Sequence, residues 1–92
     1  MANVASHPEQ LRTDAYAWKV AEGLTRHSYD YWASKPSPIE IIYEAEHRGM
    51  TLQVEIHELE RNEDYINLSV SVDTGRGFLS FFPSGTNVVI RR

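Results

Sequence analysis

The sequence predicts a small α+β domain, a two-layer sandwich in which an N-terminal helix packs on an antiparallel meander sheet of four to five strands. Apolar residues recur at helical spacing early in the chain, and from Ile39 onward they alternate with polar residues. Turns rich in glycine and asparagine separate the alternating segments. With 92 residues, the chain is long enough for one domain, residues 1–92, with one modest core.

The beginning of the chain predicts a disordered stretch over residues 1–6 followed by a helix over residues 7–26. The Ser6 hydroxyl can cap free backbone amides, and Glu9, three residues later, can reach back to the Ser6 amide. Pro8 fits the first turn of a helix, where no intrahelical amide is needed. The strongest helical pattern therefore covers residues 8–24.

The apolar stripe of this helix predicts which side faces the sheet. It contains Leu11, Ala15, Trp18 and Ala21 and is widened by Ala17, Val20 and Leu24. We therefore expect Trp18 to be buried between helix and sheet. Because Tyr16, Trp18 and Val20 also alternate at strand period, a strand remains the alternative.

Residues 27–38 predict an aromatic and proline-rich connector. Tyr29, Tyr31 and Trp32 lie close together, and Pro36 and Pro38 each force the preceding residue toward extended geometry. The connector is expected to contain one extra helical turn before it crosses to the sheet, which occupies residues 39–92.

The first hairpin has a register that the sequence predicts. A two-residue turn at Arg48-Gly49 brings together residues of the same face: Ala45 with Leu52, Tyr43 with Val54, Ile41 with Ile56 and Glu40 with His57. Arg48 would need positive φ in a type I′ turn, so a bulged turn stays open as an alternative.

The remaining strands are expected at residues 65–72, 78–82 and 88–90. A three-residue loop at residues 61–63 pairs Ile56 with Leu68 and Leu59 with Tyr65. Residues 73–77 and 83–87 have the composition of turns. The last two strands would complete the meander.

Composition excludes several classes of function. The chain has no cysteine, which removes disulfides, thiolate nucleophiles and cysteine-based metal sites. A net charge of −4 argues against a nucleic-acid groove. No apolar run is long enough to span a membrane and residues 1–6 lack a signal core, so we expect a cytoplasmic protein without membrane contact. No cofactor is expected.

Two motifs have a chemical interpretation that we weigh against a structural one. Asp73-Thr74-Gly75 matches the triplet of aspartic proteases, but only 17 residues follow it and the chain begins with a helix, which favours a plain turn. Glu40, Glu55 and His57 are expected to lie together on the open face, and a carboxylate and an imidazole are groups that can bind a metal or exchange protons. No cleft is implied there, so a solvated charge cluster is favoured.

The charge pattern carries the functional hypothesis. Residues 38–64 contain eight acidic and two basic residues, a net charge of −6, whereas the rest of the chain carries +2. One interpretation is that an acidic surface protects the sheet edge and keeps the protein in solution. The other is that it docks a basic surface of another protein. The residues expected at such a docking site are Glu40, Ile42, Glu44, Glu55, His57, Leu59 and Tyr65.

The favoured hypothesis is a non-enzymatic protein-interaction module, similar in role to an inhibitor or immunity protein, whose partner has a basic surface. Enzymatic activity is undecided at this point. One alternative is a small-molecule or metal-binding enzyme with a pocket where helix, connector and sheet meet. The other is a homodimeric structural subunit, in which self-association uses the open face or the last strand.

Overall fold

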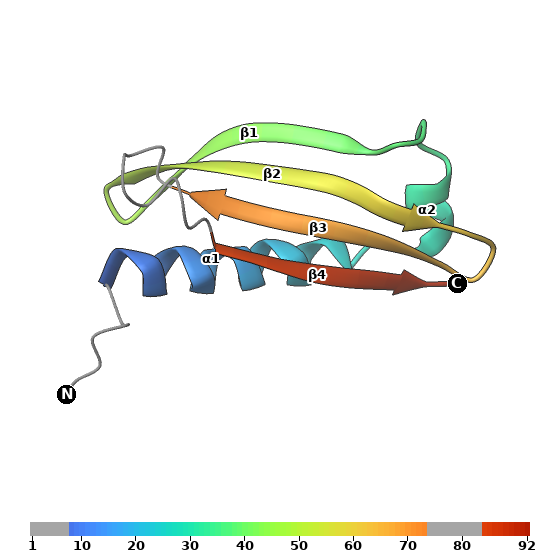
Figure 1. Ribbon diagram of the computed structural model, residues 1–92, viewed down its shortest axis with the longest axis horizontal. Coiled ribbons are helices and arrows are strands. Elements are labelled where there is room, and N and C mark those ends of the chain that lie inside the picture. The colour runs from blue at the N-terminus through green and yellow to red at the C-terminus, as the bar shows by residue number, and fades with distance from the viewer. Residues whose placement is uncertain (1–7, 74–83) are drawn as a thin grey trace.

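The computed structural model describes residues 8–73 and 84–92. Within them a four-stranded antiparallel sheet of order β1-β2-β3-β4 carries two helices (Figure 1). The elements are α1 (Pro8–Leu24), α2 (Tyr29–Ala33), β1 (Glu40–His47), β2 (Met50–Arg61), β3 (Tyr65–Asp73) and β4 (Ser84–Arg91). This arrangement confirms the predicted α+β fold with a helix packed on a meander.

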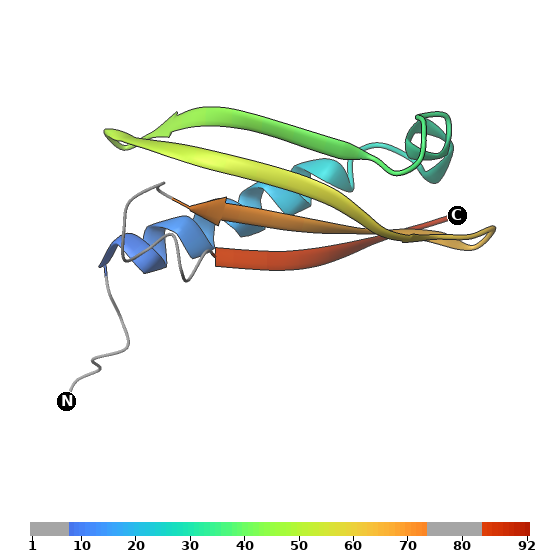
Figure 2. The same cartoon turned by 45° about the horizontal axis from the view of Figure 1, so that its top comes forward.

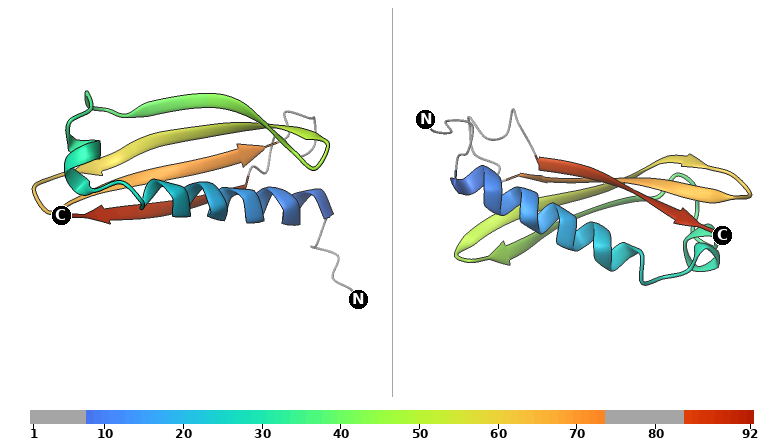
Figure 3. Two further views of the ribbon diagram at one scale, coloured as in Figure 1. Left: turned by 180° about the vertical axis from the view of Figure 1, so that it is seen from behind. Right: turned by 90° about the horizontal axis from the view of Figure 1, so that it is seen from below.

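The two layers are a twisted sheet and a single long helix. α1 lies on one face of the sheet, contacts β3 and β4, and crosses the strands obliquely (Figure 3). α2 lies at the end of the sheet where β1 begins (Figures 1 and 2). The opposite face of the sheet carries no described helix, so we call it the open face.

Small residues form the face of α1 that touches the sheet. Thr13, Ala17 and Ala21 recur every fourth position and are at most 4% exposed. Trp18 is 68% exposed, so the expectation that it is buried under the helix is wrong. The helix is rotated relative to the predicted stripe, because alanine and threonine let it approach the strands closely whereas an indole would hold it away.

Trp32 in α2 is the buried tryptophan. It is 3% exposed, and its indole Nε1 donates a hydrogen bond to the Leu24 carbonyl at 3.0 Å. The Ser28 hydroxyl caps α2 by accepting a hydrogen bond from the Tyr31 amide at 3.2 Å. The helical turn expected in the connector is thus present, and it closes the end of the core.

The predicted register of the first hairpin is confirmed. Glu40 pairs with His57, and Tyr43 pairs with Val54. The turn contains only two residues, Arg48 with φ 52° and Gly49 with φ 81°, as a type I′ turn requires. The bulged alternative is therefore not adopted here.

The predicted register of the second hairpin is wrong by two residues. Ile56 pairs with Val70 instead of Leu68, because the chain reverses later than expected: the Asn62 amide donates to the Tyr65 carbonyl, and a one-residue bulge between Glu58 and Glu60 recovers only part of the difference. Leu59 lies in this bulge and has no partner across the strands, so it does not face Tyr65. A bulge cannot be read from alternation alone.

The last strand begins earlier than expected. Residues 84–87, which have turn composition, belong to β4 and pair with residues 69–72 of β3. Cross-strand pairing overrides their local preference. The expected strand at residues 78–82 and the turn residues Thr74 and Gly75 lie outside the described residues.

The core lies between α1 and the sheet. Its largest fully buried side chains come from the helix-facing side of β2 and β3 and are Leu52, Val54, Ile66, Leu68, Val70 and Val72. Among the described residues, neither helix has the length and apolarity needed to cross a bilayer.

Candidate functional site

The open face begins at β1, an edge strand whose outward residues are mostly acidic. Glu40, Ile42 and Glu44 alternate with residues that face the helix, and all three are exposed. Glu55 of β2 pairs with Ile42, so a carboxylate also lies across from the isoleucine. The structure therefore brings these four predicted site residues together.

His57 lies between two carboxylates on this face. Its Nε2 is 3.1 Å from Glu55 Oε1, and its Nδ1 is 4.0 Å from Glu40 Oε2. The three side chains are 36 to 63% exposed, so water screens their interaction. The cluster is a solvated charge group on an open surface rather than a desolvated catalytic centre.

Ile42 is the apolar feature of this region. It is 59% exposed although isoleucine is usually buried. Glu40 and Glu44 flank it along β1, and Glu55 lies across from it on β2. Glu46 continues the same side of β1 and accepts a hydrogen bond from the Thr51 hydroxyl at 2.6 Å. We call the surface formed by Glu40, Ile42, Glu44, Glu46 and Glu55 the acidic face.

Leu59 and Tyr65 belong to a second area of the open side. Leu59 is 55% exposed at the bulge, whereas Tyr65 pairs with Arg91 of β4. The Tyr65 hydroxyl donates a hydrogen bond to Glu60 Oε1 at 2.9 Å, which raises the pKa of the phenol. These two predicted site residues are separated from Ile42 along the strands.

Glu58 does not belong to the acidic surface although it lies in the acidic segment. Its side chain is 7% exposed, and its Oε1 accepts a hydrogen bond from Arg61 Nη2 at 2.9 Å. Burial raises the pKa of this carboxyl, but hydrogen bonds from Ser37, the Ile39 amide and Arg61 outweigh burial and lower it. Glu58 is therefore a structural carboxylate.

The Glu58–Arg61 pair fastens the connector to the sheet. Arg61 Nη1 donates hydrogen bonds to the carbonyls of Ala33 at 3.1 Å and Lys35 at 3.2 Å. Glu58 accepts from the Ser37 hydroxyl at 2.7 Å and from the Ile39 amide at 3.0 Å. These contacts occupy the junction of connector and sheet where we considered an enzyme pocket.

A groove of about 310 Å³ lies beside this junction. It is lined by the connector and the start of β1, namely Lys35, Pro36, Pro38, Ile39, Glu40 and Ile41. Most of these side chains are apolar, and the two ionisable ones are Lys35 and Glu40. Within residues 8–73 and 84–92, no group of three or more histidine, aspartate and glutamate side chains is placed to hold a metal ion.

Comparison of the chain with protein-family models, with curated proteins and with solved structures finds no match. The surfaces of the molecule are therefore the basis on which its function is inferred.

Sequence reasoning missed two features of the molecular surface. Glu46 was counted as charge but not as part of the site, although its alternation with Glu40 and Glu44 places it there. The exposed Trp18 was assigned to the core, and no pattern in the helix distinguished it from the buried alanines.

Proposed function

We propose that this protein is a non-enzymatic binding module whose acidic face docks a basic surface of a partner protein. The observation that carries the proposal is Ile42, an isoleucine that is 59% exposed and has carboxylates on three sides, Glu40 and Glu44 along β1 and Glu55 across on β2. Protein interfaces combine an apolar centre, which supplies affinity, with a polar rim. The carboxylates around Ile42 would select a partner with positive charge and accelerate its association.

The surroundings of the acidic face support this role. β1 is an edge strand, so a partner can approach both the face and the edge of the sheet. The first-hairpin register fixes Ile42 opposite Glu55, and the fully buried Leu52 and Val54 hold β2 on the core beneath. A surface with this rigidity loses little conformational entropy on binding.

The proposal is tested by charge reversal with a matched control. Glu44→Lys combined with Glu55→Lys changes the acidic face, whereas Glu63→Lys combined with Asp64→Lys makes the same change in net charge at the β2–β3 turn. A partner captured from extracts of the source cell by the unchanged protein should be lost with the first variant and retained with the second. Retention of that partner by both variants would remove the acidic face as its binding site.

Salt dependence gives a second readout with purified components. Association of the captured partner should slow as ionic strength rises, and the Glu44→Lys, Glu55→Lys variant should associate slowly at every ionic strength. Ile42→Ala should mainly speed dissociation, because it removes an apolar contact and leaves the charges in place. An association rate independent of both salt and charge reversal would contradict the proposal.

A further inference from the structure

The backbone of β1 has an outward edge whose residues can be identified. In an antiparallel strand, the N–H and C=O of one residue point to the same side, and the side alternates along the chain. The Glu58 amide donates to the Ile39 carbonyl at 2.9 Å, so odd-numbered residues of this strand face β2. The outward backbone groups, beside which no described strand lies, belong to Glu40, Ile42, Glu44 and Glu46.

The residues with outward backbone groups also carry the charge of this edge. Glu40, Ile42 and Glu44 point their side chains to the open face and are exposed. The residue of an added strand directly opposite each of them would lie on the same face, about 5 Å away. Like charges at such positions destabilise pairing, whereas opposite charges stabilise it. The edge therefore repels an acidic strand, including a second β1, and favours a strand with lysine or arginine at alternate positions.

The helix-facing side of β1 is apolar. Ile41, Tyr43 and Ala45 alternate with the outward residues, and the Tyr43 side chain is 39% exposed. α1 packs mainly on β3 and β4, so it leaves part of this tyrosine uncovered. Alternate side chains of a strand added to β1 would lie beside these three residues. Such a strand is therefore expected to be basic on the open face and apolar on the helix side.

The groove of about 310 Å³ lies at the same edge, because Glu40 and Ile41 line it together with the connector. A strand residue paired with Ile41 would place its side chain beside this groove. The cation that lines the groove is Lys35, whose Nζ lies 4.5 Å from the centre of the Tyr31 ring. Because a second cation would be repelled there, the groove also favours an apolar side chain at this position.

We propose that the partner of the acidic face contributes an extended segment that pairs with β1 as an additional strand of the sheet. Strand addition rests on the proposed function, because it specifies how the same partner engages the acidic face. An antiparallel orientation is favoured, since antiparallel pairs are the more stable. Read from its N-terminus, the segment then has basic residues opposite Glu46 and Glu44, an apolar residue opposite Ile42 and a basic residue opposite Glu40.

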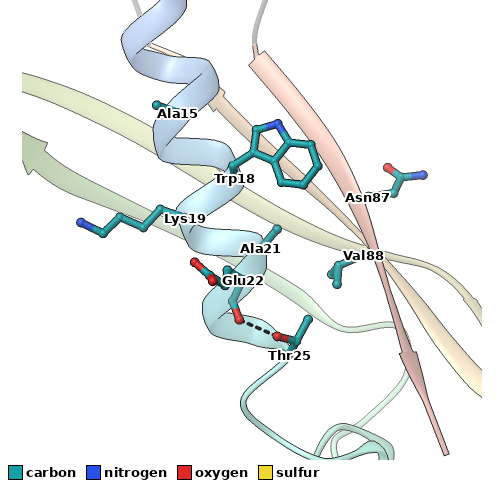
Figure 4. A pocket seen from close by; sticks show the side chains of 8 residues that line it. All are labelled: Ala15, Trp18, Lys19, Ala21, Glu22, Thr25, Asn87 and Val88. Carbon is teal, nitrogen blue, oxygen red and sulfur yellow. Dashed lines mark hydrogen bonds between the residues drawn. The ribbon is translucent and has the colours of Figure 1, made fainter.

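The opposite edge of the sheet lacks this selectivity. The Arg92 amide donates to the Asp64 carbonyl at 2.9 Å, so the outward backbone groups of β4 belong to odd-numbered residues, of which Arg91 would repel a basic strand. Figure 4 shows the Glu22 carboxylate on the side of α1 away from β4 and the Trp18 indole beside β4. Because Trp18 is 68% exposed, its fluorescence reports any strand that adds to β4 instead.

A synthetic peptide of seven residues tests the pairing with the full chain. It has lysine at its first, third and seventh positions, isoleucine at the fifth, threonine at the second, and valine at the fourth and sixth. At saturation it should slow hydrogen exchange of the Ile42 and Glu44 amides about tenfold, because both amides gain partners, and Trp18 emission should stay constant. A peptide that fails to bind at about 1 mM, or that changes Trp18 and leaves Ile42 unaffected, would overturn the inference.

Methylation of peptide amides separates strand addition from the attraction of charges. Methyl groups on the amides of the third and fifth residues block the hydrogen bonds to Glu44 and Ile42, whereas methyl groups on the fourth and sixth face away from β1. The first peptide should bind about tenfold more weakly than the second. Both peptides keep all three lysines, so equal affinities would refute strand addition while leaving docking on the acidic face intact.

Single charge reversals locate the added strand. Glu44 would lie next to it, whereas Glu55 lies one strand further away, about 10 Å from it. Glu44→Lys should raise the dissociation constant of the unmethylated peptide about tenfold, and Glu55→Lys, the matched control on the same face, by less than about threefold. Equal effects would contradict pairing along β1.

The partner captured from cell extracts separates the two proposals. If that partner is lost on reversal of Glu44 and Glu55 but does not slow hydrogen exchange at Ile42 and Glu44, the acidic face is its docking site and strand addition is refuted. Protection of both amides by the captured partner is the result that strand addition predicts.

Discussion

Glu58→Ala tests the idea that one carboxylate holds the connector on the sheet. The side chain accepts hydrogen bonds from the Ile39 amide at 3.0 Å, the Ser37 hydroxyl at 2.7 Å and Arg61 at 2.9 Å. A neutral hydrogen bond contributes about 1 kcal/mol and one to a charged group about 1.5–3 kcal/mol. Removal also leaves the 20% exposed Arg61 side chain without its counter-charge. We therefore expect a loss of about 3 kcal/mol in the free energy of unfolding.

Urea denaturation followed by fluorescence measures this loss. For a domain of this size the slope is about 1–2 kcal/mol/M, so the midpoint should fall by about 2 M. The matched control is Glu44→Ala, which removes an exposed carboxylate and should change stability by less than about 0.5 kcal/mol. A Glu58→Ala midpoint equal to that of Glu44→Ala would refute the structural role of the pair.

Three further predictions concern pH, tryptophan burial and the first turn. The folded-state pKa of Glu58 is lowered, so the ionised carboxylate contributes fully to the free energy of unfolding above its unfolded-state pKa of about 4.3. This contribution is lost as the pH falls through the folded-state pKa. Acid titration should therefore destabilise the wild type more than Glu58→Gln. Trp32→Ala should cost about 3–5 kcal/mol because that indole is 3% exposed, whereas Trp18→Ala should cost the folded monomer less than about 1 kcal/mol by thermal denaturation. Arg48 has φ 52°, so Arg48→Asn should raise stability by about 0.5–1 kcal/mol in the same assay.

The first hairpin could be predicted because two independent constraints agree. The alternation of apolar residues fixes which face each strand buries, and Arg48-Gly49 fixes the point of reversal. The second hairpin has a strong alternation as well, but its chain reverses after Asn62 rather than at residues 61–63, and the bulge at Leu59 then shifts the register by one residue. Neither feature leaves a mark in the apolar pattern. The face of the sheet on which a side chain lies was therefore more predictable than the residue opposite it on the neighbouring strand.

Members of the candidate site were predicted correctly where the alternation along a strand showed which face a carboxylate occupies. They were not predicted correctly where a carboxylate was counted only because it lies in the acidic segment, residues 38–64. Glu44 and Glu55 lie on the acidic face as expected from alternation. Glu58 alternates with Ile56 and so belongs to the helix side, where its partner Arg61 makes burial tolerable. Trp18 was misplaced because its size favours a core position, whereas close packing of α1 requires Ala17 and Ala21.

The most direct test of the proposed function is methyl NMR of the protein titrated with the captured basic partner. Ile42 reports the acidic face, Val89 reports the opposite edge of the sheet, and the fully buried Ile66 reports the core. The proposal predicts that the Ile42 methyl signals shift or broaden first, with Val89 and Ile66 unchanged. Binding that moves Val89 and leaves Ile42 at its free position would show that the partner does not use the acidic face.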